Sequence, residues 1–206
     1  MVSEVEPLTP QRLHVELLFC RKANMEKKVA IAYIHGTLGD ATYSKLHSTF
    51  RISQSNGEWL LRLKKLINGL GAKAWIYKEG SSRNVSILET TGKFLSRNFD
   101  PANLTATPER IAYVRGYFDA ERGVPRNPSN RFYIQFVQKD FEELEKVRNI
   151  LEELDIRCGK IHNPSIKVDP EYWRFFVRAQ SYQRFIELIG SWHPIKSFFL
   201  QKGMMI

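Results

Sequence analysis

Two short segments of the chain repeat each other, and each leads into an acidic residue. The run IAYIHG at residues 31–36 returns almost unchanged as IAYVRG at residues 111–116, and the copies continue to Asp40 and Glu121 respectively. A carboxylate beside the last unpaired carbonyls of a helix provides the oxygen ligands that hard divalent cations prefer. Paired acids in repeated surroundings therefore predict a two-fold metal site, and a substrate with approximate two-fold symmetry.

The duplication continues beyond these segments. Alternating runs at residues 48–54 and 131–138 end on Gln54 and Gln138. The leucine-rich helical pattern of residues 60–70 returns 84 residues later at residues 144–154. Further strands are expected at residues 72–78, 83–88, 157–162 and 172–179. The repeat is too long for a solenoid, so the sequence predicts two similar half-domains that each read helix, strand, strand, helix, strand, strand.

The repeated helices need a physical reason to contain glycine. Gly116 lies in the middle of the second one, where glycine costs roughly 1 kcal/mol relative to alanine. Close approach of another helix would compensate, and Gly36 is the natural partner. The second helix should begin near Pro108, with Thr107 as its cap, and end near Glu121. The two helices are therefore predicted to pair across a pseudo-twofold axis.

Composition limits the class of protein. The chain has 206 residues, 43% of them hydrophobic, which is enough for a proper core. Its formal net charge of +9 favours a polyanionic partner. Cys20 and Cys158 lack metal-ligand spacing, so neither a zinc site nor a disulfide framework is expected. No run approaches the ~20 apolar residues of a membrane span. We expect an intracellular protein without a secretion signal, cytoplasmic or associated with the nucleoid.

The second repeat resembles a known signature. Residues 114–121, VRGYFDAE, are similar to the signature of LAGLIDADG homing endonucleases, in which the metal-binding acid follows a glycine by five residues, as Glu121 follows Gly116. The first copy departs from the pattern, because Asp40 follows Gly36 by only four residues. The resemblance covers about residues 30–196. It points to the single-chain, two-motif type, which is monomeric and pseudo-symmetric.

This resemblance implies an α+β fold of two pseudo-symmetric αββαββα half-domains, each with a twisted antiparallel saddle sheet, packed through the two motif helices. The expected division is an N-terminal extension at residues 1–25, a first half-domain at 26–99, a linker at 100–106 and a second half-domain at 107–206. The extension could contact the flanks of a DNA site or cap the fold.

The resemblance also implies the chemistry. Asp40 and Glu121 would bind Mg²⁺, with Mn²⁺ able to substitute, together with the main chain at Gly39 and Ala120. Gln54 and Gln138 would position the attacking water. Lys196 would polarise water or the scissile phosphate, and Lys93 is the candidate for the same role in the first half. The expected reaction is phosphodiester hydrolysis on both strands of double-stranded DNA.

Strand parity points to the surface that would contact DNA. Arg131, Tyr133 and Gln135 share one face of their run, and Arg174 and Arg178 alternate with apolar residues in another. Arginine and glutamine suit bidentate contacts with guanine and adenine. The predicted DNA-contacting residues are Lys45, Arg51, Arg83, Arg126, Arg131, Tyr133, Gln135, Lys160, His162, Arg174 and Arg178.

Three functions stay open at this point. The leading hypothesis is a site-specific DNA endonuclease, intron-encoded or free-standing, that recognises a long DNA site. The second is an RNA maturase acting on intron RNA. The third is a sequence-specific DNA-binding protein that does not cleave.

Overall fold

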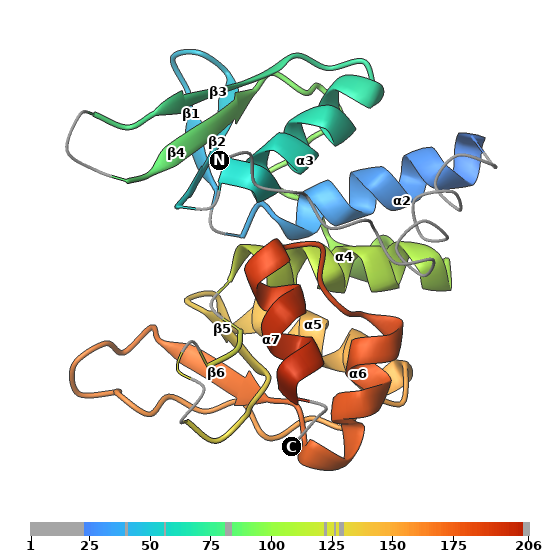
Figure 1. The fold of residues 1–206 in the computed structure, drawn as a ribbon, viewed down its shortest axis with the longest axis vertical. Coiled ribbons are helices and arrows are strands. Elements are labelled where there is room, and N and C mark those ends of the chain that lie inside the picture. Colours follow the sequence, from blue (N-terminus) through green and yellow to red (C-terminus); the bar gives the residue numbers. More distant parts are fainter. Residues whose placement is uncertain are drawn as a thin grey trace, which may run out of the picture.

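The computed structural model describes residues 23–203, apart from residues 40, 56, 81–83, 122, 126, 128 and 129, and it describes side chains from Glu26 onward. The chain folds into two halves that meet at a pair of adjacent helices (Figure 1). In the first half the elements are α2 (Ala23–Gly36), β1 (Thr42–Ser44), β2 (Thr49–Gln54), α3 (Gly57–Gly69), β3 (Ala74–Lys78) and β4 (Ser86–Thr90).

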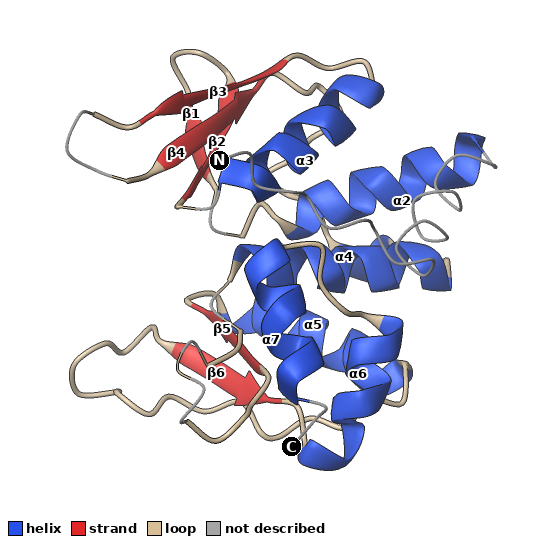
Figure 2. Ribbon diagram, in the orientation of Figure 1, coloured by secondary structure: helices blue, strands red, loops and turns tan. Residues whose placement is uncertain are grey.

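The 3₁₀ helix η1 (Pro101–Asn103) leads into the second half. The elements of that half are α4 (Thr107–Ala120), β5 (Gln135–Gln138), α5 (Phe141–Glu153), β6 (Trp173–Phe176), the 3₁₀ helix η2 (Ala179–Ser181), α6 (Tyr182–Leu188) and α7 (Pro194–Gly203). In Figure 2 the strands of both halves lie on the same side of the molecule, and the helices pack against them. The predicted α+β arrangement of two halves is confirmed.

The two sheets differ in extent. The first-half sheet has four antiparallel strands in the order β1-β2-β4-β3. In the second half β5 pairs with β6, and residues 157–162, predicted as a strand, contribute isolated bridges at Cys158 and His162. The strand predicted from residue 131 begins at Gln135, because residues 131–134 form no regular ladder in the described chain. Both differences make the second-half sheet smaller than predicted, but the sheet is still formed by the predicted runs that contain β5 and β6.

Helices α2 and α4 pack through their glycines, as the sequence predicts. A Cβ atom on Gly36 would overlap the carbonyl oxygen of Tyr113 and lie 2.7 Å from the amide nitrogen of Tyr117. A Cβ atom on Gly116 would overlap the carbonyl oxygen of Tyr33. Each glycine therefore faces the backbone of the other helix at the equivalent position. The contact is reciprocal, which is the property expected of a pseudo-twofold axis.

The other repeated helices bury the predicted faces. In α3 the side chains of Trp59, Leu60, Leu63 and Ile67 are buried. In α5 the buried set is Leu144, Val147, Ile150 and Leu151. These apolar faces cover the inner surfaces of the two sheets, and no helix of the described residues covers the opposite surfaces (Figure 2). Among the described residues, no helix is both long enough and apolar enough to cross a membrane.

The start of α4 differs from the prediction. Its N-cap residue is Ala106, which has no side chain able to cap, and Thr107 is already within the helix. A side-chain cap is found instead at η1, in the linker before α4. There the Asp100 carboxylate accepts a hydrogen bond from the amide nitrogen of Ala102 at 3.1 Å. The helix nevertheless ends at Ala120, directly before the predicted catalytic acid.

Candidate functional site

The predicted site lies where α2 and α4 end. Gln54, at the end of β2 in the first half, donates a hydrogen bond from its amide Nε2 to the carbonyl oxygen of Ala120, at 3.1 Å. Gln138, at the end of β5 in the second half, has its Nε2 atom 3.0 Å from the position of a Cβ atom on Gly39. Each glutamine thus reaches the helix end of the opposite half. The structure brings the two predicted glutamines to the two predicted main-chain ligand positions.

Glu121 stands directly after α4. It is the C-cap residue, its backbone is extended, and its amide nitrogen still donates to the carbonyl of Tyr117 at 3.3 Å. Its side chain is half-buried. The helix therefore stops just before this residue, which places the glutamate beside the last carbonyls of α4 as the sequence predicts. Asp40, its predicted counterpart, lies outside the described residues.

The chain winds more tightly where α2 ends. The helix stops at Gly36, and the next amides make i to i+3 bonds, Thr37 to Ile34 at 3.0 Å and Leu38 to His35 at 3.0 Å. A 3₁₀ turn rises about 2.0 Å per residue, against about 1.5 Å in an α-helix. The tighter winding is partial, because the Thr37 amide also keeps an α-type bond to the Tyr33 carbonyl at 3.2 Å. Gly39, the last described residue before position 40, follows these turns.

Lys196 contacts the end of α4 from α7. Its Nζ atom donates to the main-chain carbonyl of Asp119 at 2.9 Å, and also to the carbonyls of Phe118 and Glu121. The residue is buried. A cation at a helix C-terminus satisfies unpaired carbonyls and offsets the helix dipole. Lys196 therefore holds the backbone that carries Glu121, and its predicted contact with water or phosphate stays a prediction. Lys93 is exposed on the loop after β4.

Asp119, the other acid of the second motif, has a different environment. It is fully buried, and its carboxylate accepts from the hydroxyl of Tyr33 at 2.7 Å, from the amide of Trp192 at 2.9 Å and from Ser191. Trp59 in turn donates to the Tyr33 hydroxyl at 2.9 Å. Burial raises the pKa of Asp119. This network joins both halves, and apart from Asp119 itself its residues carry no pattern from which it could be predicted.

Glu143 of α5, an acid that was not predicted to belong to the site, lies close to the end of α2. The carboxylate of Glu143 in α5 accepts from the Tyr113 hydroxyl at 3.3 Å, and its Oε1 atom is 3.9 Å from the Cβ position of Gly39. The repeat could have identified Glu143. The 84-residue offset relates Glu143 to Trp59, and Tyr113 is the counterpart of Tyr33. Trp59 contacts Tyr33 as Glu143 contacts Tyr113. The two halves thus place different partners at equivalent positions.

Two buried polar atoms lie beside this acid. Within the described part of the chain the Tyr117 hydroxyl and the Gln138 Nε2 atom form no hydrogen bond of good geometry. Burial raises the pKa of Tyr117, the nearby carboxylates of Glu143 and Glu121 raise it further, and the Gln138 amide is close enough to lower it slightly. Buried polar groups are usually satisfied, by protein or by ordered water. Both side chains lie against Gly39, just beyond the end of α2.

The donor set fits a hydrated divalent cation. Around the end of α4 the described groups are the Glu121 carboxylate and the Ala120 carbonyl, both hard oxygen donors. No group of three or more histidine, cysteine, aspartate or glutamate side chains could hold a metal within the described ranges. An all-protein cage is thus not found in them. A cation that keeps several waters and binds few carboxylates, as Mg²⁺ does, is compatible with this arrangement.

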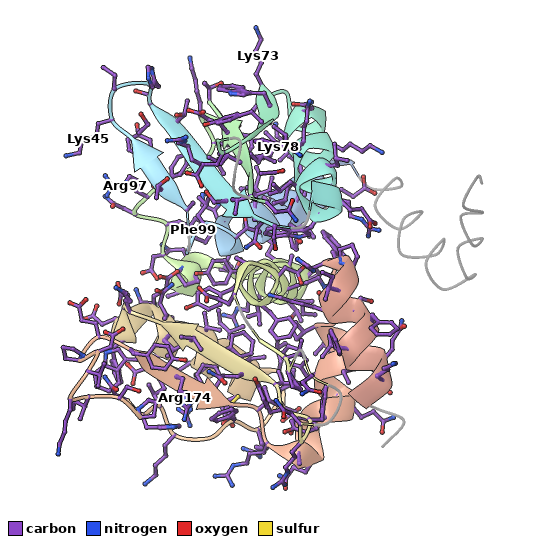
Figure 3. The ribbon with its side chains drawn as sticks, turned by 60° about the vertical axis from the view of Figure 1, so that its left-hand side comes forward. Lys45, Lys73, Lys78, Arg97, Phe99 and Arg174 are labelled. Atoms are coloured by element: carbon purple, nitrogen blue, oxygen red, sulfur yellow. The ribbon has the colours of Figure 1, made fainter. Side chains whose placement is uncertain are left out.

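Most predicted DNA-contacting residues lie on or beside the open faces of the sheets. Lys45 projects from the turn after β1, and Arg174 lies over the second-half sheet (Figure 3). Arg51 is half-buried on β2, and Arg131, Lys160 and His162 are exposed. Tyr133 packs edge-on against Phe176. Gln135 also lies in this sheet but is buried, with Nε2 3.5 Å from the Tyr172 hydroxyl. Arg83 and Arg126 lie outside the described residues.

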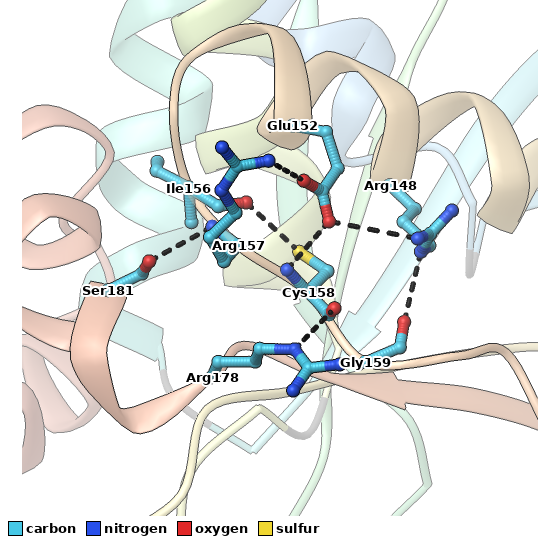
Figure 4. Close-up of polar contacts among 8 residues, drawn as sticks. All are labelled: Arg148, Glu152, Ile156, Arg157, Cys158, Gly159, Arg178 and Ser181. Carbon is cyan, nitrogen blue, oxygen red and sulfur yellow. Dashed lines mark hydrogen bonds and ion pairs between the residues drawn. The ribbon is translucent and has the colours of Figure 1, made fainter.

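Arg178 has a structural contact as well. Its Nε atom donates to the carbonyl of Cys158 at 3.1 Å, within a polar cluster at the end of α5 (Figure 4). In the same cluster the Glu152 carboxylate accepts from the amide of Cys158 at 2.8 Å and lies 3.7 Å from Arg148. The cluster joins α5 to the second-half sheet, so Arg178 is oriented by the fold before any ligand binds.

Comparisons with known proteins identify the fold. Residues 108–190 match the sequence profile of the LAGLIDADG-like domain family. The chain has the LAGLIDADG fold. A solved structure of mesophilic variants of the homing endonuclease I-DmoI is 19% identical and covers 80% of this chain and 96% of its own, with a TM-score of 0.62. I-DmoI in complex with DNA and Mn is 20% identical over 80% and 97% of the two chains, with a TM-score of 0.58.

The LAGLIDADG fold is shared with a second kind of protein. Full-length DUF199/WhiA from Thermatoga maritima is 14% identical, covers 94% of this chain and 66% of its own, and gives a TM-score of 0.63. Among curated proteins the search found no significant match. At these identities the structural matches establish the fold, and the function has to be argued from the site.

Proposed function

We propose that the protein is a site-specific, divalent-metal-dependent double-stranded DNA endonuclease of the homing type, acting as a monomer. The observation that carries this proposal is the reciprocal placement of the two glutamines. Gln54 reaches the α4 end at Ala120, and Gln138 reaches the α2 end at Gly39. Two equivalent half-sites about one pseudo-twofold axis match the two antiparallel strands of a duplex.

The roles of the residues follow from their positions. Glu121 and the Ala120 carbonyl would hold a cation at one half-site, and the Gly39 carbonyl and the sequence-predicted Asp40 would hold one at the other. Mg²⁺ bound there would activate water and stabilise the leaving 3′ oxygen. Gln54 and Gln138 would orient the attacking water through their amides. Lys196 keeps the α4 end in place through its bonds to the carbonyls around Glu121.

Charge and shape support DNA as the substrate. The chain carries a net charge of +9, and the open sheet faces present Arg51 and Arg174. A β-surface can enter the major groove and read base edges there. I-DmoI, which shares the fold, has been solved in complex with DNA and Mn. A long recognition site is expected, because each half contributes its own sheet.

The test is cleavage of a randomised double-stranded DNA library by the purified chain, with Mg²⁺ and with chelator in parallel, followed by sequencing of the cut ends. Metal-dependent cuts at one long motif are expected. Glu121→Gln should abolish double-strand cleavage and retain binding, and Asp40→Asn should do the same or leave a nick. Loss of binding in both variants would overturn the catalytic assignment.

A second candidate is a nucleic-acid-binding protein that does not cleave. It is favoured by the shortened first motif and by Lys196, whose ammonium group donates to three main-chain carbonyls. Binding of the library without any cutting in Mg²⁺ would select this function. Structured intron RNA would then be the next ligand, because a maturase could keep the same fold and basic surface.

A further inference from the structure

The open face of the first-half sheet carries a connected chain of four polar side chains. They are Thr49 and Arg51 of β2, Tyr77 of β3 and Glu89 of β4. Strand β4 lies between β2 and β3, and Glu89 is in register with Arg51 on one side and with Trp75 on the other. These residues have the opposite parity to the buried Phe50 and Ile52. These four side chains therefore lie on the face of the sheet that a DNA duplex would meet.

Glu89 is the anchor of this chain. Its Oε1 atom accepts from the Thr49 hydroxyl at 2.5 Å, and its Oε2 atom accepts from the Tyr77 hydroxyl at 2.8 Å. The residue is 9% exposed. Hydrogen bonds from Thr49 and then Tyr77 lower the pKa of Glu89, although burial opposes them. The carboxylate thus stays ionised at neutral pH and is held from both oxygens.

Tyr77 links Glu89 to Arg51 by hydrogen bonds. Its hydroxyl oxygen accepts from Arg51 Nε at 3.1 Å and from Nη2 at 2.6 Å, while its proton is donated to Glu89. A phenol has one donor and can accept two bonds, so this hydroxyl is fully used. The guanidinium also lies 3.9 Å from Glu89 and 5.8 Å from the Tyr77 ring centroid. Its orientation is therefore fixed without any ligand.

Within the described residues, one edge of the Arg51 guanidinium makes no hydrogen bond. Arginine has five N–H donors in a planar fork, and the bonds to Tyr77 occupy the Nε edge. The Nη1 hydrogens and the outer Nη2 hydrogen point away from that edge. Two parallel donors of this kind match the O6 and N7 acceptors of guanine in the major groove. The Arg51 side chain is 38% exposed, so these donors can be reached.

We propose that Tyr77 and Glu89 are specificity-determining positioning residues, which hold Arg51 so that it reads a single guanine in the first half of the DNA site. The inference rests on the proposed function, because it assigns a sequence preference to the sheet that would bind the duplex. A pre-oriented guanidinium loses less freedom on binding and rejects bases whose acceptors do not match its fixed edge.

The second half provides an internal contrast. Arg174 lies over the Phe176 ring at 5.2 Å and has its Nε atom 3.3 Å from His162 Nε2, and in the described chain no carboxylate forms an ion pair with it. The aromatic contact of Arg51 with Tyr77 thus has a counterpart in Arg174, but of the two arginines only Arg51 has a carboxylate beside it among the described residues. The guanine read by Arg51 should therefore be specified more strictly than any base at the Arg174 position.

The test is binding-site selection from a randomised duplex library in chelator, so that nothing is cut. The proteins are the wild-type chain, Arg51→Lys, Tyr77→Phe, Glu89→Gln and Tyr43→Phe. Tyr43 has the opposite parity on β1 and packs against Phe50, so its variant removes one hydroxyl from the core-facing side of the same sheet. A thermal melt of each variant verifies folding, and Glu89→Gln serves if Tyr77→Phe is unstable.

Arg51→Lys, Tyr77→Phe and Glu89→Gln should each weaken the preference for guanine at one shared position, about tenfold or more for Arg51→Lys, and leave the other positions unchanged. Tyr43→Phe should match the wild type. If Arg51→Lys alone changes that position, Tyr77 and Glu89 do not position it and the inference is wrong. It is also wrong if no variant changes any position. A wild-type chain that selects no sequence would instead overturn the proposed function.

Discussion

The side chain of Gln54 crosses from one half of the molecule to the other, where its amide donates to the Ala120 carbonyl at 3.1 Å. Gln54 ends a strand of the first half, whereas Ala120 ends the motif helix of the second. Each helix end is therefore completed by a residue from the opposite repeat. A half-site built in this way needs both repeats, which explains why the pairing of α2 and α4 has to be close.

Replacing Gln54 by leucine should slow cleavage of one DNA strand. The substitution removes the amide beside Ala120, and misplacement of a reacting group by about 1 Å can cost roughly 100-fold in rate. The other half-site keeps Gln138, so nicked duplex should accumulate. The measurement is a single-turnover reaction with each strand end-labelled in turn, together with DNA affinity, which should not change.

Gln138→Leu is the matched variant, and it should leave the opposite strand uncut. Equal slowing of both strands by either substitution would show that the two half-sites do not act separately. If both variants bind DNA and cleave both strands as the wild type does, the glutamines have no catalytic role.

Alanine at Gly116 should destabilise the protein strongly. The added methyl group would overlap the Tyr33 carbonyl on the neighbouring helix, so α2 and α4 would have to move apart. Overpacking of a core typically costs ~1–3 kcal/mol, and an overlap with backbone should reach at least the upper end of that range. Chemical denaturation monitored by circular dichroism would measure the loss.

Gly69→Ala is the control for that experiment. Gly69 is the last residue of α3, and no atom outside its immediate surroundings lies within 4 Å of an added Cβ. Alanine there should be neutral or stabilising by about 0.4–1 kcal/mol. If Gly116→Ala were as well tolerated as Gly69→Ala, the close helix contact would not exist in solution.

The repeat made the framework of the site predictable. Matching glycines in both copies predicted a close helix pair, and the matching alternating runs predicted a glutamine at the same strand end in each half. These inferences succeed because a duplicated sequence has to bury duplicated apolar faces, whatever its detailed contacts. The buried faces of α3 and α5 follow the same rule, with Leu60 and Leu144 as one equivalent pair.

Contacts that differ between the halves were not predictable in the same way. The Tyr33 hydroxyl meets Trp59 and Asp119, whereas the equivalent Tyr113 meets Glu143. The repeat predicts the position of the hydrogen-bond partner of each tyrosine, but it does not predict which residue type occupies that position. The contacts of Lys196 depend on how α7 packs against α4, and no periodicity in the sequence encodes that long-range geometry.

Stability should decrease as the pH falls below the usual titration range of histidine, in part because of His35. Its Nδ1 atom lies 2.9 Å from the Ile31 carbonyl, its Nε2 accepts from the Ser96 amide at 3.2 Å, and it stacks on Phe99. These contacts require the neutral ring with its proton on Nδ1. Burial lowers the pKa of His35 below 6.5.

The unfolded chain therefore takes up a proton on this residue at a higher pH than the folded chain does. The contribution of His35 to stability is fully present above about pH 6.5 and is lost as the pH falls through its folded-state pKa. His35→Gln should flatten the dependence of unfolding free energy on pH between 7 and 5. Equal slopes in this variant and in the wild type would contradict the assignment.

Cys158 should resist alkylation in the native protein. It is buried, and desolvation, with a smaller effect of Glu152, raises its pKa to about 12. Only on the order of one such thiol in ten thousand is a thiolate at pH 8, and the thiolate is the reactive form. Iodoacetamide labelling followed by mass spectrometry distinguishes it from Cys20. Labelling at the rate seen in denaturant would show that the cluster in Figure 4 opens readily.

Lys196→Met separates two roles for the lysine. The variant keeps an apolar stem but removes the ammonium that donates to the carbonyls of Phe118, Asp119 and Glu121. Leaving buried carbonyls unsatisfied typically costs ~1–3 kcal/mol for each group, so the melting temperature should fall by several degrees. Cleavage should fall too, because the α4 end that carries Glu121 would lose its support.

The comparison of the two readouts decides between the roles. If the lysine acts by holding the helix end, a lower melting temperature should accompany the slower cleavage, and DNA binding by the folded fraction should persist. If it acts on water or phosphate, as the sequence resemblance implies, the rate should fall while the melting temperature stays at the wild-type value. The three bonds to the main chain lead us to expect the first result, measured by calorimetry and single-turnover cleavage on the same preparation.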